Sequence, residues 1–160
     1  RIAAALGMED SWPVVTEPFI QWVIEDVFPL GRPDFAAVGA ELVGDVHPYE
    51  LMKLRLLNGS HSLMAYLGYL AGRDTIADAI STPEIARAVE GYWGEVIPTL
   101  GAGLDGNAYV ARLRTRFANP ALKHRTSQIA MDGSQKVPPR WLDWPCGGRC
   151  GHGQRCGPFR

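Results

Sequence analysis

The longest regular pattern of apolar positions in the chain runs from residue 49 to about residue 71. Its members recur mostly at steps of three or four residues, which is the repeat of one helix face, and they are Leu51, Leu54, Leu57, Met64, Leu67 and Leu70. Pro48 and Glu50 suit a first helical turn, because proline needs no amide donor there and a carboxylate favours the positive end of the helix dipole. Gly72 supplies a stop. The pattern therefore predicts one long helix over residues 49–71.

Shorter apolar patterns predict further helices downstream, separated by prolines and by a turn. Pro98 and Pro120 close two of these helices, and the run Asp132-Gly133-Ser134 breaks another. The helices are expected at residues 83–96, 107–117 and 120–131, and a fifth helix is expected to begin within residues 138–143.

Two short strands are expected before the long helix. Residues 19–26 and 40–46 are rich in β-formers. Residues 1–19 contain Pro13 and Pro18 and are expected to form loops and turns. The sequence thus predicts a mainly α fold with a short β element near its N-terminal end.

The composition is that of an ordinary globular protein, with 46% hydrophobic and 21% charged residues among 160. A net charge of −1 argues against a protein that binds nucleic acid or an anionic membrane surface. No apolar run approaches the roughly 20 residues that cross a bilayer. Because the chain starts at Arg1 with neither a Met nor a signal-peptide pattern, we expect a piece of a longer protein. The first 145 residues contain no cysteine, which fits a cytoplasmic protein.

Three polar residues that could take part in catalysis lie within the long predicted helix, namely Lys53, Asn58 and His61. At about 100° per residue, Asn58 lies roughly 140° and His61 roughly 80° round the helix from Lys53, so the three share one sector. A buried Lys can take the proton of an alcohol that loses hydride, while Asn stabilises the oxygen and His holds a hydroxyl. Gly59 costs a helix about 1 kcal/mol relative to Ala, which is explained if another backbone or a ligand approaches there. The spacing alone is not specific, since such residues are more often solvated polar groups.

Several segments carry a family resemblance. They are WVIED at 22–26, FP at 28–29, GRP at 31–33, PYELMKLRLLNGSHS at 48–62, AYLGYLAG at 65–72 and RFANP at 116–120. Over about residues 10–143 the chain resembles the polyol-specific long-chain dehydrogenases of the mannitol dehydrogenase family. The resemblance implies a Rossmann-type NAD(P) domain followed by a largely helical substrate domain, and catalysis without a metal.

The same resemblance implies roles for the three polar residues. Lys53 would be the general acid/base, Asn58 would help to stabilise the substrate oxygen, and His61 would bind and orient the substrate. A second oxygen-stabilising Asn of the family has no counterpart here, and no Gly-rich dinucleotide loop follows a predicted strand, because Gly101-Ala102-Gly103 lies between predicted helices. We therefore expect the Rossmann domain to be missing, the chain to be inactive alone, and NAD, or NADP, to bind mainly to the missing domain.

Within the family, residues 119–136 are more similar to fructuronate reductase (D-mannonate oxidoreductase) than to mannitol dehydrogenase. A uronate carries a carboxylate that mannitol lacks, and Lys136, Arg125 or Arg140 could hold it, with Lys136 as the preferred contact. The expected reaction is the NAD-dependent, reversible reduction of D-fructuronate to D-mannonate. Mannitol, another polyol or an altronate-type substrate is the alternative. Two neighbouring residues are expected to lie on a solvated helix face: Lys123 and His124.

The last stretch changes character, because residues 144–160 are almost all Gly, Cys, Arg and Pro. We expect an aberrant or disordered tail, produced by a reading-frame shift near residue 144. A rival hypothesis from a different class is a small zinc-binding or nucleic-acid-binding module. Its spacing matches known zinc sites poorly, and its ligands would be Cys146, Cys150, His152 and Cys156.

The expected organisation has three parts. Residues 1–47 would be the end of the cofactor domain with connecting strand and loops, residues 48–143 an incomplete helical substrate domain, and residues 144–160 the tail. The expected partner is a small sugar acid or polyol, with no nucleic acid, no membrane and no metal. The sequence does not indicate an oligomeric state.

Overall fold

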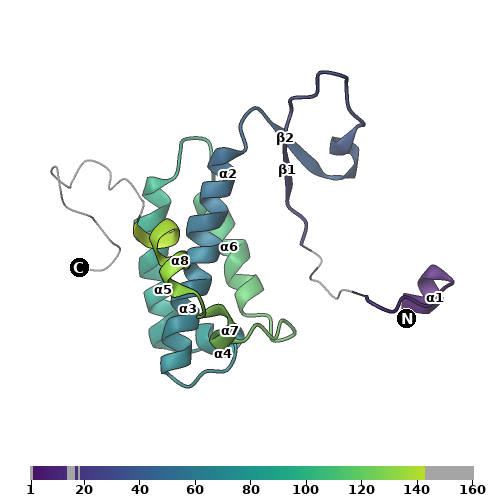
Figure 1. Ribbon diagram of the computed structural model, residues 1–160. Helices are drawn as coiled ribbons and strands as arrows, with labels where there is room; N and C mark the ends of the chain where they lie inside the picture. Colours follow the sequence, from purple (N-terminus) through teal and green to yellow (C-terminus); the bar gives the residue numbers. More distant parts are fainter. Residues whose placement is uncertain (1, 14–16, 18, 143–160) are drawn as a thin grey trace. The chain divides into compact units, whose positions relative to one another are not determined.

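The computed structural model describes residues 2–13, 17 and 19–142, and the predicted tail lies outside them. The chain divides into two compact units, Arg1–Gly44 and Asp45–Arg160 (Figure 1). The second unit carries most of the helices, and both units together confirm the mainly α fold with a short β element near its start.

The first unit contains a two-stranded parallel sheet, in which β1 (Trp22–Glu25) pairs with β2 (Ala40–Val43) from Trp22↔Ala40 to Glu25↔Val43. Both predicted strands are therefore present, but each is only four residues long. A parallel pair needs a crossover connection, and this one contains the short 3₁₀-helix η1 (Phe35–Val38).

The expectation of loops throughout residues 1–19 is wrong at one place. A short helix, α1 (Ile2–Leu6), lies there. Its sequence contains three consecutive alanines, which have the highest helix propensity, and the prolines that suggested a loop come only after it. Pro13 and Pro18 therefore do not prevent a helix at residues 2–6, because they lie after it.

The second unit begins with a continuous helical run over residues 47–70, which confirms the extent of the long predicted helix. The run consists of α2 (His47–Met52), a π-helical segment η2 (Lys53–Asn58) and α3 (Gly59–Leu70). The remaining elements are α4 (Ile76–Ile80), α5 (Pro83–Val96), η3 (Ile97–Thr99), α6 (Gly106–Phe117), α7 (Thr126–Ile129), α8 (Gly133–Val137) and η4 (Pro138–Leu142). Of these, α5 and α6 confirm the second and third predicted helices.

The predicted helix over residues 120–131 is wrong in extent, because only α7 is helical there. The chain before α7 forms a turn at Asn119, whose side chain accepts a hydrogen bond from the amide of Ala121 (3.0 Å). It then pairs with a distant segment through an isolated antiparallel bridge between Thr75 and Arg125. Such long-range pairing overrides local helix propensity.

Two further differences have local causes. Asp132 has a left-handed backbone (φ 59°), so the predicted break is present, but a new helix, α8, starts directly after it. The sequence reading also missed α4, which begins with a capping box between Thr75 and Asp78.

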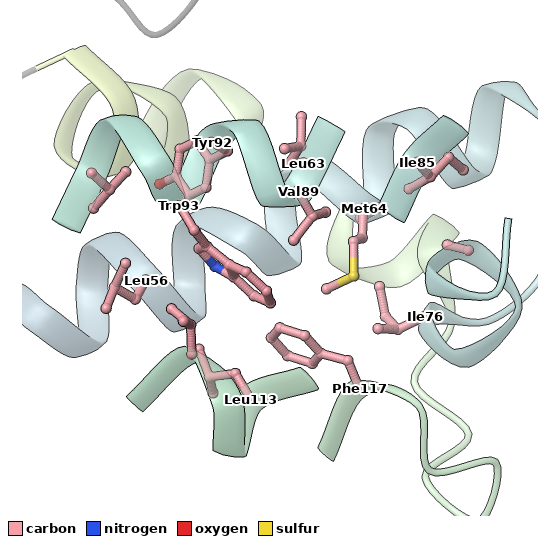
Figure 2. Close-up of a cluster of buried hydrophobic side chains, with 14 of the residues drawn as sticks. Leu56, Leu63, Met64, Ile76, Ile85, Val89, Tyr92, Trp93, Leu113 and Phe117 are labelled. Carbon is pink, nitrogen blue, oxygen red and sulfur yellow. The ribbon is translucent and has the colours of Figure 1, made fainter. Parts of the chain in front are cut away.

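One hydrophobic cluster holds the second unit together (Figure 2). Trp93 from α5 and Phe117 from α6 point into its middle, and Leu56 and Met64 of the long helical run are fully buried there. Full burial of one such side chain contributes about 1.5–3 kcal/mol, so α5 and α6 help to fix the long helix, which also packs against α4 and α7. No helix in the part of the chain that the structure describes is long and apolar enough to cross a membrane.

Candidate functional site

The π-helical segment changes the geometry that the sequence predicted for Lys53, Asn58 and His61. A π turn takes one residue more than an α turn, so residues beyond it are turned back by about 100°. Asn58 then lies roughly 40° and His61 roughly 20° from the line of Lys53, on opposite sides of it. The angles of 140° and 80° expected for a regular helix are therefore wrong. The three residues occupy a narrower face than predicted.

A tyrosine accounts for Gly59, which lies at the end of the π-helical segment. A Cβ atom added to Gly59 would lie 1.9 Å from the hydroxyl oxygen of Tyr92 and 2.8 Å from its Cζ. The suggested approach of a backbone or ligand is therefore wrong, since a side chain from α5 fills this place. Glycine is required so that the Tyr92 ring can reach the backbone of the long helix.

Next to α3 lies a hollow of about 390 Å³, which we call the basic hollow. It brings together five of the six predicted site residues, but Lys53 is not among its lining residues. His124 is exposed, as expected, but it also lines the hollow. Gln128 and Ile129 of α7 line it too, and the sequence reading did not single them out because a helix of four residues carries no periodic signal. The lining residues are Asn58, His61, His124, Arg125, Gln128, Ile129, Lys136 and Arg140.

His61 is half-buried at the wall of the basic hollow. Its ring lies 5.0 Å from that of Phe117 and 5.7 Å from that of His124, measured between centroids, and the two imidazoles meet edge to face. These contacts restrict the ring, so His61 presents its nitrogens in a limited range of directions.

Two of the cations in the basic hollow are anchored by hydrogen bonds to the protein. Lys136 donates from Nζ to the carbonyl of Ile129 (3.1 Å). Arg140 donates from one terminal nitrogen to Ser62 Oγ (2.6 Å) and to the carbonyl of Asn58 (3.4 Å). Burial lowers the pKa of the Arg140 guanidinium from its ordinary value, with nearby tyrosines acting in the opposite direction, and an arginine stays charged regardless. Both cations are thus held at fixed places.

Lys53 has a different environment, because its side chain is exposed. A lysine acts as a base near neutral pH only if burial or nearby positive charge lowers its pKa. The described residues of the second unit do not bury Lys53, so they do not by themselves form the buried environment that a catalytic lysine needs.

The glycine-containing loop before α6 does not fit a dinucleotide phosphate. The loop with Gly101 and Gly103 follows the helix η3, as the sequence suggested, and not a strand. The next helix, α6, is capped by the carboxylate of Asp105, which accepts from the amide of Ala108 (2.8 Å). A carboxylate there takes the amide donor and supplies the negative charge that a phosphate would otherwise bring.

Within the same described ranges, no group of three or more His, Cys, Asp or Glu side chains could hold a metal ion. The Cys/His ligands of the zinc hypothesis, Cys146, Cys150, His152 and Cys156, lie outside the residues that the structure describes.

Comparisons with known proteins agree with the predicted resemblance. A family model described as the mannitol dehydrogenase C-terminal domain matches residues 45–146. D-mannonate oxidoreductase of Escherichia coli is 56% identical over 146 residues, which cover 89% of this chain and 30% of that protein. Mannitol 2-dehydrogenase of Aspergillus niger is 44% identical over 143 residues, which cover 86% of this chain and 29% of that protein. The chain thus spans about 30% of the length of such relatives.

Two solved structures share the fold. A D-sorbitol dehydrogenase in substrate-free form superposes with a TM-score of 0.79 at 38% identity, covering 88% of this chain and 30% of the other. The Pseudomonas fluorescens mannitol 2-dehydrogenase, in a ternary complex with NAD and D-mannitol, gives a TM-score of 0.72 at 41% identity, covering 82% and 27%. The chain therefore belongs to the mannitol dehydrogenase family, through the C-terminal domain of that family.

Proposed function

We propose that this chain forms the substrate-binding part of a cytoplasmic, NAD-dependent dehydrogenase that reversibly reduces D-fructuronate to D-mannonate during hexuronate breakdown. The observation that carries this proposal is the charge of the basic hollow. Three cations, Arg125, Lys136 and Arg140, line it together with Asn58 and His61, and no Asp or Glu is among its lining residues. The proposal also rests on the 56% identity to a D-mannonate oxidoreductase.

A carboxylate explains this charge better than a neutral polyol does. Hydrogen bonds between charged groups contribute about 1.5–3 kcal/mol each, and an arginine can hold a carboxylate by two parallel bonds. Mannitol has no charge to offset three cations. A uronate, by contrast, would place its carboxylate among them while its carbonyl faces Asn58 and His61.

The proposed chemistry assigns one role to each of Lys53, Asn58 and His61. Asn58 donates to the substrate oxygen as negative charge develops on it. His61 orients a neighbouring hydroxyl, and Lys53 gives the proton to the oxygen during reduction and takes it back during oxidation. Lys53 is exposed within the second unit, and we expect the proposed cofactor domain to cover it. NAD(H), or NADP(H), would bind mainly to that domain and exchange the hydride with the substrate carbon.

A second candidate is a polyol dehydrogenase acting on mannitol, or on an altronate-type substrate, by the same chemistry. The 44% identity to a mannitol 2-dehydrogenase favours it. The deciding experiment assays the complete protein with D-fructuronate and D-fructose, each with both reduced nicotinamides. We expect kcat/KM for fructuronate to exceed that for fructose by at least about 100-fold, which is two charge-assisted contacts at the lower end of their range. Equal values, or a preference for fructose, would contradict the uronate assignment.

A further inference from the structure

The π-helical segment η2 needs a donor that a regular helix would not need. In an α-helix the amide of Gly59 would bond to the carbonyl of Arg55. Here it bonds to the carbonyl of Leu54, five residues back. The Tyr92 hydroxyl donates to the Arg55 carbonyl instead, at 2.7 Å and in a buried position. The side chain of Tyr92 thus supplies the donor that the changed backbone geometry withdraws.

Neighbouring interactions support the same segment. The Ser60 hydroxyl donates to the Leu56 carbonyl and accepts a hydrogen bond from Trp93 Nε1 (2.6 Å). From η4, Trp141 Nε1 donates to the Gly59 carbonyl (3.3 Å). Side chains from two other elements therefore bind the carbonyls in and just after the π turn. Among them, Tyr92 bonds to the carbonyl whose α-helical partner has been lost.

Tyr92 is well suited to remain a donor. Its side chain is 3% exposed, and burial raises the pKa of its phenol above the ordinary value, outweighing the opposite effects of Trp141, Arg55 and Arg140. The hydroxyl therefore keeps its proton at any pH at which the protein would work. Its ring also fills the space that the missing Cβ of Gly59 leaves open.

We propose that Tyr92 is a positioning residue: its hydrogen bond to the Arg55 carbonyl holds the π turn and keeps Lys53 on the helix face of Asn58 and His61. The inference rests on the proposed function, because it concerns the residues proposed there for proton transfer. Without the π turn, Lys53 would be turned by about 100° relative to the residues of α3. It would then miss the substrate oxygen that Asn58 stabilises while His61 orients the neighbouring hydroxyl.

The test uses Tyr92→Phe in the complete enzyme, with Tyr109→Phe as the matched control. Tyr109 is also a buried core tyrosine (2% exposed), but it lies on α6 and none of the described donors to η2 comes from it. We expect Tyr92→Phe to lower kcat by roughly 10- to 100-fold, the cost of a misplaced catalytic group, while KM changes by less than about twofold. Tyr109→Phe should leave both constants near their wild-type values.

A second variant covers the case in which Tyr92→Phe does not fold. Gly59→Ala would push the Tyr92 hydroxyl off the Arg55 carbonyl without removing it, and it should lower kcat in the same way. In the Tyr92→Phe background, Gly59→Ala should lower kcat by a smaller factor, because the atom it meets at 1.9 Å is gone. An unchanged kcat in Tyr92→Phe, or equal losses in the two tyrosine variants, would overturn the proposal.

These outcomes are separate from those that test the substrate. If the wild-type enzyme reduced fructose and not fructuronate, the uronate assignment would fail, and the same variants assayed with fructose would still test the role of Tyr92. If the wild type reduced fructuronate and Tyr92→Phe did so at an equal rate, only the positioning role would fail.

Discussion

Replacing Ser60 with alanine would show how strongly the backbone of the proposed catalytic helix is tied to the core. Ser60 is fully buried on α3. Its hydroxyl is the acceptor for the indole N–H of Trp93, at 2.6 Å, and donates to the carbonyl of Leu56. In Ser60→Ala the Trp93 N–H loses this partner in a site where the indole is 2% exposed.

The expected cost follows from these contacts. A buried donor without a partner costs about 1–3 kcal/mol. The higher helix propensity of alanine offsets up to about 0.7 kcal/mol of this loss in stability. The free energy of unfolding should therefore fall by about 0.3–3 kcal/mol. Trp93→Phe removes the donor as well as packing volume, and in the double variant the two costs should not add, with a coupling of about 0.5–3 kcal/mol.

Urea unfolding of the complete protein, followed by circular dichroism, measures these differences. Ser81→Ala is the matched control, because the Ser81 hydroxyl also donates to the carbonyl four residues back (2.7 Å), but no indole depends on it. Ser81 is exposed, so its loss should change stability by no more than about 0.5 kcal/mol. Equal effects of the two serine variants, or strictly additive costs with Trp93→Phe, would refute the argument.

Three further predictions concern the proposed site and its support. Lys53→Met should lower kcat of the complete enzyme by roughly 10²–10⁴-fold, which is the contribution of a general acid/base. Its circular dichroism spectrum should not change, and an unchanged kcat would show that Lys53 is not the general acid/base. Lys136→Ala should raise KM for fructuronate at least about tenfold, which is one charge-assisted bond, and leave KM for fructose unchanged, with the exposed Lys123→Ala as control. Thr75→Ala should cost about 0.5–2 kcal/mol in urea unfolding by removing the α4 capping box with Asp78; no loss would mean that tertiary contacts alone fix that helix.

The helices that the sequence predicted correctly are those marked by residues within or directly beside the helix. The apolar repeat from Leu51 to Leu70 predicted the helical run over residues 47–70. The prolines around α5 and α6 marked their ends. Such signals depend only on a residue and its neighbours within about two turns.

The features that were missed depend on distant residues. The π turn is tied to Tyr92, which is 37 positions from Arg55 along the chain, and no periodicity within residues 49–71 reports that contact. The wrong extent of the helix before Asp132 has a similar cause, because Thr126 is buried and donates to the carbonyl of Arg73 (2.7 Å). A local pattern cannot show that a segment is held by a partner some 50 residues away.

For the candidate site, the sequence supplied residue types and the family resemblance supplied their roles. The structure adds that five of the six residues line one hollow, and that Lys53 lies outside it. The exposed environment of Lys53 could not be read from the sequence, because its neighbours Met52 and Leu54 suit a buried helix equally well. The roles themselves stay predictions until the variants are measured.

The short pairing of Thr75 with Arg125 affects how the site can diverge among relatives. The amide of Ile76 bonds to the carbonyl of His124 (3.0 Å), and the amide of Thr126 bonds to the carbonyl of Asp74 (3.0 Å). This pairing fixes where the segment of residues 124–140 begins, whose residues line the basic hollow opposite Asn58 and His61. Its position does not depend on the length of the loops before it. Insertions around residues 101–105 should therefore leave this segment in place. Substrate preference can then change through substitutions within residues 124–140, while the sequence of the helix that carries Lys53 stays the same.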